Sequence, residues 1–144
     1  MEFLDTNVLV YAASQQAADQ QKAGVARELL RRGPAEFGIS LQVLQEFYVA
    51  VRSPRKLALS HEDAVMFCGQ WRAFTVLEPT LRLFETATEL CGRYKIGFYD
   101  AAILAAARQL NCSKVHSEDL NDGQEYEGVR VENPFRGIVS APAP

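Results

Sequence analysis

Hydrophobic and polar positions along the chain follow two alternating patterns, which predict strands separated by helices. Short apolar runs bounded by turn residues are typical of strands, and longer stretches with apolar positions every third or fourth residue are typical of helices. The predicted strands are residues 1–5, 36–39, 73–77, 113–116 and 129–132. The predicted helices are residues 16–32, 41–52, 61–71, 81–94 and 99–110.

Capping residues support several of these helices. Ser40, Ser60 and Thr80 each precede a helical pattern, and a side-chain hydroxyl at that position accepts a backbone N–H that the helix leaves unpaired. Residues 101–107 are seven consecutive Ala, Ile or Leu residues, so we expect the helix over 99–110 to be buried nearly all round.

Short strands separated by helices predict a parallel sheet with helices on both faces. The expected fold is a three-layer α/β/α domain with a central parallel sheet of about five short strands. We expect one domain over residues 1–139 and a flexible tail over 140–144, which reads Ser-Ala-Pro-Ala-Pro.

The composition excludes several classes of protein. Apolar residues make up 48% and charged residues 23% of the 144 positions, as in a globular domain. No apolar stretch is long enough for a membrane span, and an acid near the start is unlike a signal peptide. The three cysteines are widely spaced, which favours reduced thiols. We therefore expect a cytoplasmic protein.

Four acids follow the predicted strands, either directly or in a following helix. Asp5 ends the first strand, Glu46 lies in the helix after the second, Asp100 is in the first turn of the apolar helix, and Asp119 follows strand 113–116. Each acid has an ordinary explanation by itself, such as a cap, a turn or a solvated helix face. In open parallel sheets, however, ligands bind beyond the carboxyl ends of the strands, so the four acids are expected to converge.

Converging carboxylates repel one another, and a divalent cation removes that conflict. The set contains no His or Cys, so hard Mg²⁺ or Mn²⁺ is favoured. Such ions activate water and stabilise charge on a phosphodiester. The net charge of −3 becomes +1 when these four acids are left out. Metal-dependent phosphodiester cleavage is the chemistry that this pattern predicts.

Five segments carry a resemblance to a known family. They are residues 3–11 (Phe-Leu-Asp-Thr-Asn-Val-Leu-Val-Tyr), 40–48 (Ser-Leu-Gln-Val-Leu-Gln-Glu-Phe-Tyr), 98–107, 116–123 and 129–135. Together they resemble PIN-domain ribonucleases, and most closely the VapC-type toxins of toxin–antitoxin pairs. The resemblance covers about residues 1–135.

The resemblance implies a site and roles within it. It implies that Asp5, Asp100 and Asp119 contact Mg²⁺ or Mn²⁺ directly or through water, and that Glu46 binds a second metal or orients the attacking water. Polar support is expected from Thr6, Asn7 or Ser117. Asp122 is a further candidate acid that alternatively shapes a turn.

The resemblance also implies partners. The substrate is RNA of an unspecified kind, and the protein partner is a small antitoxin whose C-terminal segment lies along the toxin and places a basic residue near the carboxylates. Tyr11, Phe47 and Tyr48 are candidates for a groove that receives this segment, although core packing explains them as well. Homodimers are common in the family.

Other functions fit the residues less well. A phosphohydrolase with Asp5 as nucleophile would carry a second acid two positions later, where this chain has Asn7. No glycine-rich phosphate loop follows a strand, and His61 and His116 belong to no catalytic pattern. A non-catalytic RNA-binding or regulatory module that keeps the acids for a structural ion is the main alternative.

Overall fold

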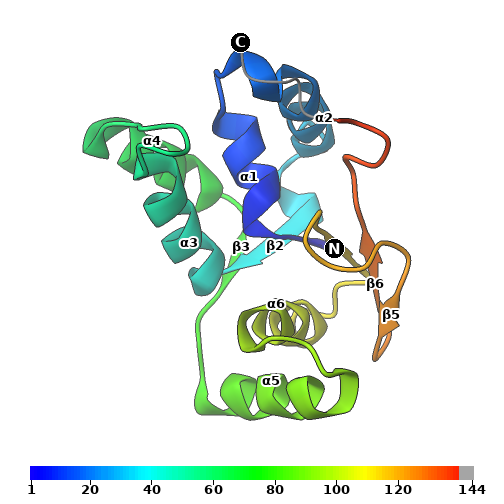
Figure 1. The fold of residues 1–144 in the computed structure, drawn as a ribbon. Helices are drawn as coiled ribbons and strands as arrows, with labels where there is room; N and C mark the ends of the chain where they lie inside the picture. Colours follow the sequence, from blue (N-terminus) through cyan, green and yellow to red (C-terminus); the bar gives the residue numbers. More distant parts are fainter. Residues whose placement is uncertain (140–144) are drawn as a thin grey trace.

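The computed structural model describes residues 1–139, in which a sheet lies between layers of helices (Figure 1). The tail expected over 140–144 lies outside the described residues. The strands are β1 (Glu2–Leu4), β2 (Phe37–Ser40), β3 (Thr75–Leu77), β4 (Lys114–His116), β5 (Glu125–Tyr126) and β6 (Val129–Glu132). The helices are α1 (Thr6–Ala13), α2 (Gln20–Leu30), α3 (Leu41–Arg52), α4 (His61–Trp71), α5 (Leu81–Tyr94) and α6 (Phe98–Gln109), with short 3₁₀ turns at Ala17–Asp19 and Pro34–Glu36.

The predicted three-layer α/β/α class is confirmed. The strand order is β3-β2-β1-β4-β6-β5, and every neighbouring pair is parallel except β5 with β6. In Figure 1, α1 and α2 lie above the sheet, and α6 and α5 lie below it. The chain thus brings the carboxyl ends of β1, β2 and β4 to one edge.

The sheet has six strands, so the expected number was one too low. The extra strand is β5, which has two residues and pairs antiparallel with β6. Glu127 (φ 50°) and Gly128 (φ 88°) make the turn between them, and two successive positive φ angles suit a tight hairpin. A strand of two residues has no detectable period, which is why the sequence did not reveal it.

The helix α1 was also missed, and its sequence explains why. Thr6, Val8, Val10 and Tyr11 are β-branched or aromatic residues with modest helix propensity. The helix forms because Asp5 caps it, its side chain accepting the Thr6 N–H at 2.7 Å, and because Val8 and Leu9 are buried. The helix predicted over 16–32 is in fact the 3₁₀ turn Ala17–Asp19 followed by α2.

The other predicted helices and caps are confirmed within a residue or two. The hydroxyls of Ser40, Ser60 and Thr80 accept the backbone N–H three residues later. In α6, Ala101 and residues 103–107 are buried, as the apolar run predicts. Phe3 and Leu4 of β1 and Val115 of β4 are fully buried, so the sheet is centred in the core and fixes the strand ends that carry the site.

The structure also bears on the expectations about the cysteines and about membrane spans. Cys68, Cys91 and Cys112 are free thiols, and burial raises the pKa of Cys112 to about 11. None of the helices among residues 1–139 is long and apolar enough to cross a membrane.

A partly exposed ion-pair network links the amino end of β1 to neighbouring elements. One Glu2 carboxylate oxygen accepts from Arg32 at 2.7 Å, and the other lies 2.6 Å from Nε2 of the buried His116. The bond from Arg32, with a further contribution from His116, lowers the pKa of Glu2 to about 2, against the opposing effect of burial. The stabilisation that Glu2 contributes is therefore complete above about pH 4.5 and is lost as the pH falls toward 2.

We accordingly expect Glu2→Gln to be less stable than the wild type at neutral pH, by about 1–2 kcal/mol after discounting for solvent screening. The difference should shrink as the pH falls from 4.5 to 2. Urea unfolding at a series of pH values measures the difference in free energy of unfolding and its change with pH. Glu62→Gln on the exposed start of α4 is the control. A constant difference across this range would show that the Glu2 charge does not stabilise the fold.

Candidate active site

Three strand ends and one helix start bring the predicted site residues together. Asp5 follows β1, Ser117 and Asp119 follow β4, and Glu46 lies on α3, the helix that follows β2. Asp100 is in the first turn of α6. The parallel order β2-β1-β4 places these ends side by side, as expected for a site at the carboxyl edge of a sheet.

Asp5 is the buried centre of this cluster. Its Oδ1 accepts the Thr6 N–H and its Oδ2 accepts the Ser117 hydroxyl, both at 2.7 Å. Burial is the main cause that raises the pKa of Asp5 to about 6, and the charges of Asp119 and Glu46 raise it further. The protein thus keeps a carboxyl group where its charge is poorly compensated.

Asn7 and Ser117 connect Asp5 to Asp119. The Asn7 amide donates to Asp119 Oδ2 at 3.1 Å and lies 3.5 Å from Asp5 Oδ2. The Asp119 N–H donates to the Ser117 hydroxyl at 3.1 Å. Two of the expected polar supports therefore hold the acids in place, whereas Thr6 Oγ1 is buried and has no hydrogen-bond partner among residues 1–139.

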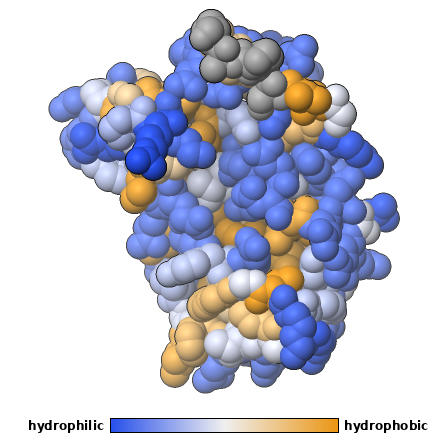
Figure 2. Space-filling view, viewed as in Figure 1, coloured by the Kyte–Doolittle hydropathy of each residue, from blue (hydrophilic) through white to orange (hydrophobic). Residues whose placement is uncertain are grey.

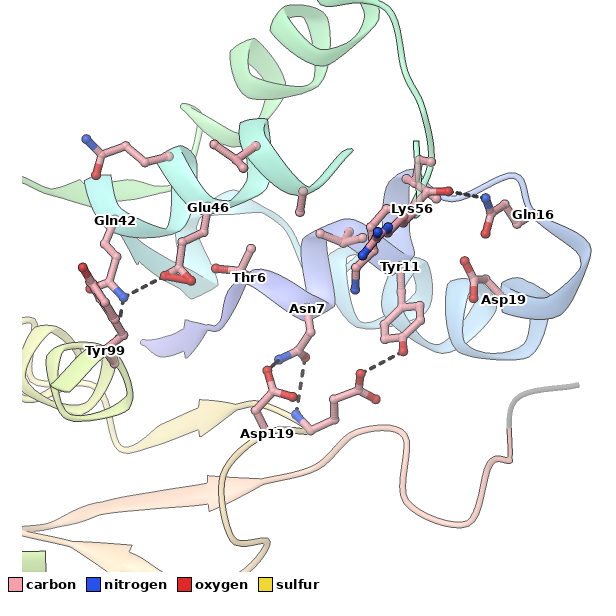
Figure 3. A pocket seen from close by; sticks show the side chains of 17 residues that line it. Thr6, Asn7, Tyr11, Gln16, Asp19, Gln42, Glu46, Lys56, Tyr99 and Asp119 are labelled. Carbon is pink, nitrogen blue, oxygen red and sulfur yellow. Dashed lines mark hydrogen bonds between the residues drawn. The ribbon is translucent and has the colours of Figure 1, made fainter. Parts of the chain in front are cut away.

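Glu46 is exposed and has a neighbour that the sequence analysis missed. Gln42 lies one turn earlier on α3, and its amide donates to Glu46 Oε1 at 2.7 Å and to the Tyr99 carbonyl at 3.4 Å (Figure 3). Gln42 therefore links the Glu46 carboxylate to the start of α6. The i, i+4 spacing of Gln42 and Glu46 was the available signal.

Asp100 completes the set. It is half-buried, and burial together with the charge of Asp119 raises its pKa. The charge of Asp119 therefore raises the pKa of both Asp5 and Asp100, and the charge of Glu46 raises the pKa of Asp5. These pairwise effects indicate that the four predicted acids lie at the same end of the sheet.

Asp122 lies apart from this group. Its Oδ1 accepts the Asn133 N–H at 2.8 Å and its Oδ2 lies 3.1 Å from Arg136. These contacts fix the segment that follows β6. Of the two explanations for Asp122, the structure supports the turn.

Two of the four acids, Glu46 and Asp119, line an open cleft of about 730 Å³, within the usual range of ligand sites. It is lined by α1, α3, the start of α6 and the chain segments that follow α1, α3 and β4. The lining includes Thr6, Asn7, Glu46, Tyr99 and Asp119 (Figure 3).

The aromatic residues expected in a groove have three different environments. Tyr11 lines the cleft, and its hydroxyl donates to Glu118 at 2.8 Å. Phe47 is fully buried against Phe67 and Trp71, so of its two explanations the structure supports core packing. The Tyr48 hydroxyl lies 3.0 Å from His61 Nδ1, away from the cleft lining.

The residues fit a hard divalent cation in their chemistry. The donor set consists of carboxylate, amide and hydroxyl oxygens, the buried Asp5 lacks a positive partner in the part of the chain described, and Thr6 Oγ1 is an unpaired oxygen beside it. No three His, Cys, Asp or Glu side chains within residues 1–139 are already grouped as a metal-binding set. A cation would thus draw oxygens together that the fold holds near one another.

Comparisons with known proteins agree with this fold. A family model described as the PIN domain matches residues 3–121. Two similar solved structures are VapC20 from Mycobacterium tuberculosis, described as a toxin that cleaves the sarcin–ricin loop (21% identity, 80% of this chain and 87% of that chain, TM-score 0.64), and a toxin–antitoxin complex from Klebsiella pneumoniae (21%, 94% and 98%, 0.68). A third is VapBC2 from Rickettsia felis bound to a promoter DNA fragment (19%, 92% and 97%, 0.63). A search of curated proteins found no match.

Proposed function

Because the chain belongs to the PIN-domain family, we propose that it is a divalent-metal-dependent endoribonuclease and the toxin of a toxin–antitoxin pair. The observation that carries this proposal is the buried Asp5 carboxyl, whose pKa is raised by burial and by Asp119 and Glu46. A divalent cation bound to these carboxylates would relieve their mutual repulsion and compensate the buried charge of Asp5. Two members of the cluster, Glu46 and Asp119, also line an open cleft of about 730 Å³ that a substrate can approach.

Each residue has a distinct part in this chemistry. Asp5, Asp100 and Asp119 would hold Mg²⁺ or Mn²⁺, which when bound supplies a Lewis acid for the phosphate and lowers the pKa of water. Asn7 and Ser117 fix the Asp5 and Asp119 carboxylates by hydrogen bonds. Gln42 occupies Glu46 Oε1, which leaves Oε2 to accept a hydrogen bond from the attacking water.

Cleavage of a mixed pool of structured RNAs tests the proposal. Purified protein is incubated with Mg²⁺, Mn²⁺ or EDTA beside the Asp5→Asn/Asp100→Asn variant, and the fragment ends are mapped by sequencing. We expect metal-dependent cuts by the wild type alone. Binding that shifts RNA without producing fragments under every condition would instead support the non-catalytic RNA-binding module.

We propose an antitoxin partner for the same cleft. Two of the similar structures are described as VapBC bound to DNA and a third as FitAB bound to a DNA fragment. A fourth is described as a toxin–antitoxin complex. The acidic lining of this cleft suits a partner segment with a cationic side chain. A protein captured by the tagged double variant should, when added back, inhibit cleavage by the wild type; a captured protein without inhibition would argue against this role.

We also propose that the chain forms a homodimer through exposed apolar residues of α5 and α6. Leu81 is 74% and Phe84 52% exposed, and the Phe98 ring lies 5.6 Å from that of Phe84. Figure 2 shows hydrophobic atoms gathered over the lower part of the molecule, where these helices lie in Figure 1. Sedimentation equilibrium should give twice the 16.0 kDa chain mass; a monomer at all concentrations would refute the dimer.

A further inference from the structure

The lining of the cleft combines two kinds of charge. Glu46, Asp119, Glu118 and Asp19 are acidic, and Arg55 and Lys56 are the two Lys or Arg side chains that line it within residues 1–139. A phosphate backbone is repelled by the first group and attracted by the second. The position of the two cations therefore bears directly on how a polyanion enters.

Arg55 and Lys56 are free to bind an incoming anion. Both are exposed, and neither belongs to an ion pair in the described part of the chain. The nearby Lys22, by contrast, is already paired with Glu118 at 3.0 Å. Two cations without partners on a cleft wall are suited to phosphate.

The loop that carries these cations is anchored to the rest of the fold. The Gln16 side-chain amide donates to the Lys56 carbonyl, and the Lys56 N–H donates to the Ser53 carbonyl at 3.0 Å. The Arg55 N–H donates to the Ser53 hydroxyl at 3.3 Å. The backbone of the loop therefore holds Arg55 and Lys56 at a defined place on the wall.

The aromatic ring of Tyr99 lies at the end of the cleft opposite Lys56. The Tyr99 side chain lines the cleft and is 73% exposed, while the Gln42 amide donates to its carbonyl. Figure 3 shows Tyr99 and Lys56 toward opposite ends of the view, with Glu46, Thr6 and Asn7 between them. An exposed ring on an anchored backbone offers a stacking surface for a base.

We propose that Arg55 and Lys56 bind the substrate phosphates on one side of the carboxylates and that the Tyr99 ring stacks on a base on the other, so that the cut falls between them. This inference rests on the proposed ribonuclease function and assigns its substrate-positioning residues. A paired base inside a duplex cannot offer its face to Tyr99, so the strand is unpaired at the site. The phosphate contacts carry affinity without sequence preference.

Binding without cleavage tests the phosphate contacts. A short unstructured RNA is titrated with antitoxin-free protein in EDTA at several salt concentrations, and the same strand in a duplex is titrated in parallel. Arg55→Gln/Lys56→Gln should lower the slope of log K against log salt by about 1.4, at roughly 0.7 for each lost contact. Arg72→Gln, a change of an exposed base outside the cleft lining, should leave the slope unchanged.

Tyr99 has its own test. Tyr99→Ala should weaken binding of the single strand by about 5- to 150-fold, the usual effect of removing one stacked base, and Tyr99→Phe should restore it. In cleavage assays, Tyr99→Ala and the double Gln variant should raise KM more than they lower kcat.

Three results would overturn the inference: an unchanged salt slope in the double Gln variant, equal affinity of Tyr99→Ala and wild type, or duplex binding as tight as that of the single strand. Failure of the nuclease proposal is a separate result. If the wild type binds as described and cuts no RNA with any metal, the positioning residues stand and the catalytic assignment falls.

Discussion

Replacing Asp100 by Asn should lower the rate of the proposed RNA cleavage by about 1,000-fold, because it removes a charge that would hold the metal and so weakens the several kcal/mol of stabilisation that the ion would supply. The fold should be retained, since Asn has nearly the same shape and Asp100 is half-buried at a helix start. The rate is measured on a single RNA at saturating Mg²⁺, and circular dichroism checks the fold.

Asp122→Asn is the matched control for this change. Asp122 is an acid of the same region, but it accepts the Asn133 N–H and pairs with Arg136 rather than with the cluster. We expect its cleavage rate to stay within about two-fold of the wild type, as for residues outside the reacting site. Full activity of Asp100→Asn, or an equal loss in both variants, would refute the assignment of Asp100.

Replacing Asp5 by Asn should make the metal-free protein more stable at neutral pH. The fold raises the pKa of Asp5 from 3.8 to about 6, so it favours the protonated carboxyl. The stability that this group contributes is complete below about pH 3.8 and is lost as the pH rises through 6. Near pH 8 the buried charge therefore costs about 3 kcal/mol, which Asp5→Asn removes while an amide can still bond to Thr6 and Ser117.

The same variant should lose its response to metal. A cation that binds only the native protein raises the melting temperature of the wild type, and Asp5→Asn should show a much smaller rise with Mg²⁺ or Mn²⁺. Thermal melts in EDTA and in a metal titration measure both effects, with Asp63→Asn on α4 as an exposed control. A less stable variant in EDTA, or an undiminished metal response, would contradict the role of Asp5.

The prediction of α3, α4, α5 and α6 from the sequence succeeded because their signals are local. A hydroxyl cap at Ser40, Ser60 or Thr80 and an apolar period require only neighbouring residues. The alternation of strands with helices then implied a parallel sheet. Since ligands bind at the carboxyl ends of such strands, the four acids could also be named in advance as a group.

The helix α1 shows where local signals fail. Its β-branched and aromatic residues locally favour a strand over a helix, and the outcome is decided by burial of Val8 and Leu9 against the neighbouring helices. Phe47 likewise has the same chemistry as a groove residue, and only the packing of α4 against α3 places it against Trp71 in the core.

The sequence by itself thus determined the layers of the fold and the four candidate acids, because both follow from short-range patterns. The tertiary structure decided which polar groups hold those acids. Asn7 reaches Asp119 across 112 positions of sequence, and Gln42 reaches the Tyr99 carbonyl across 57. It also placed Arg55 and Tyr99 on one cleft, because contacts between distant segments depend on how strands and helices pack, and no local period encodes that.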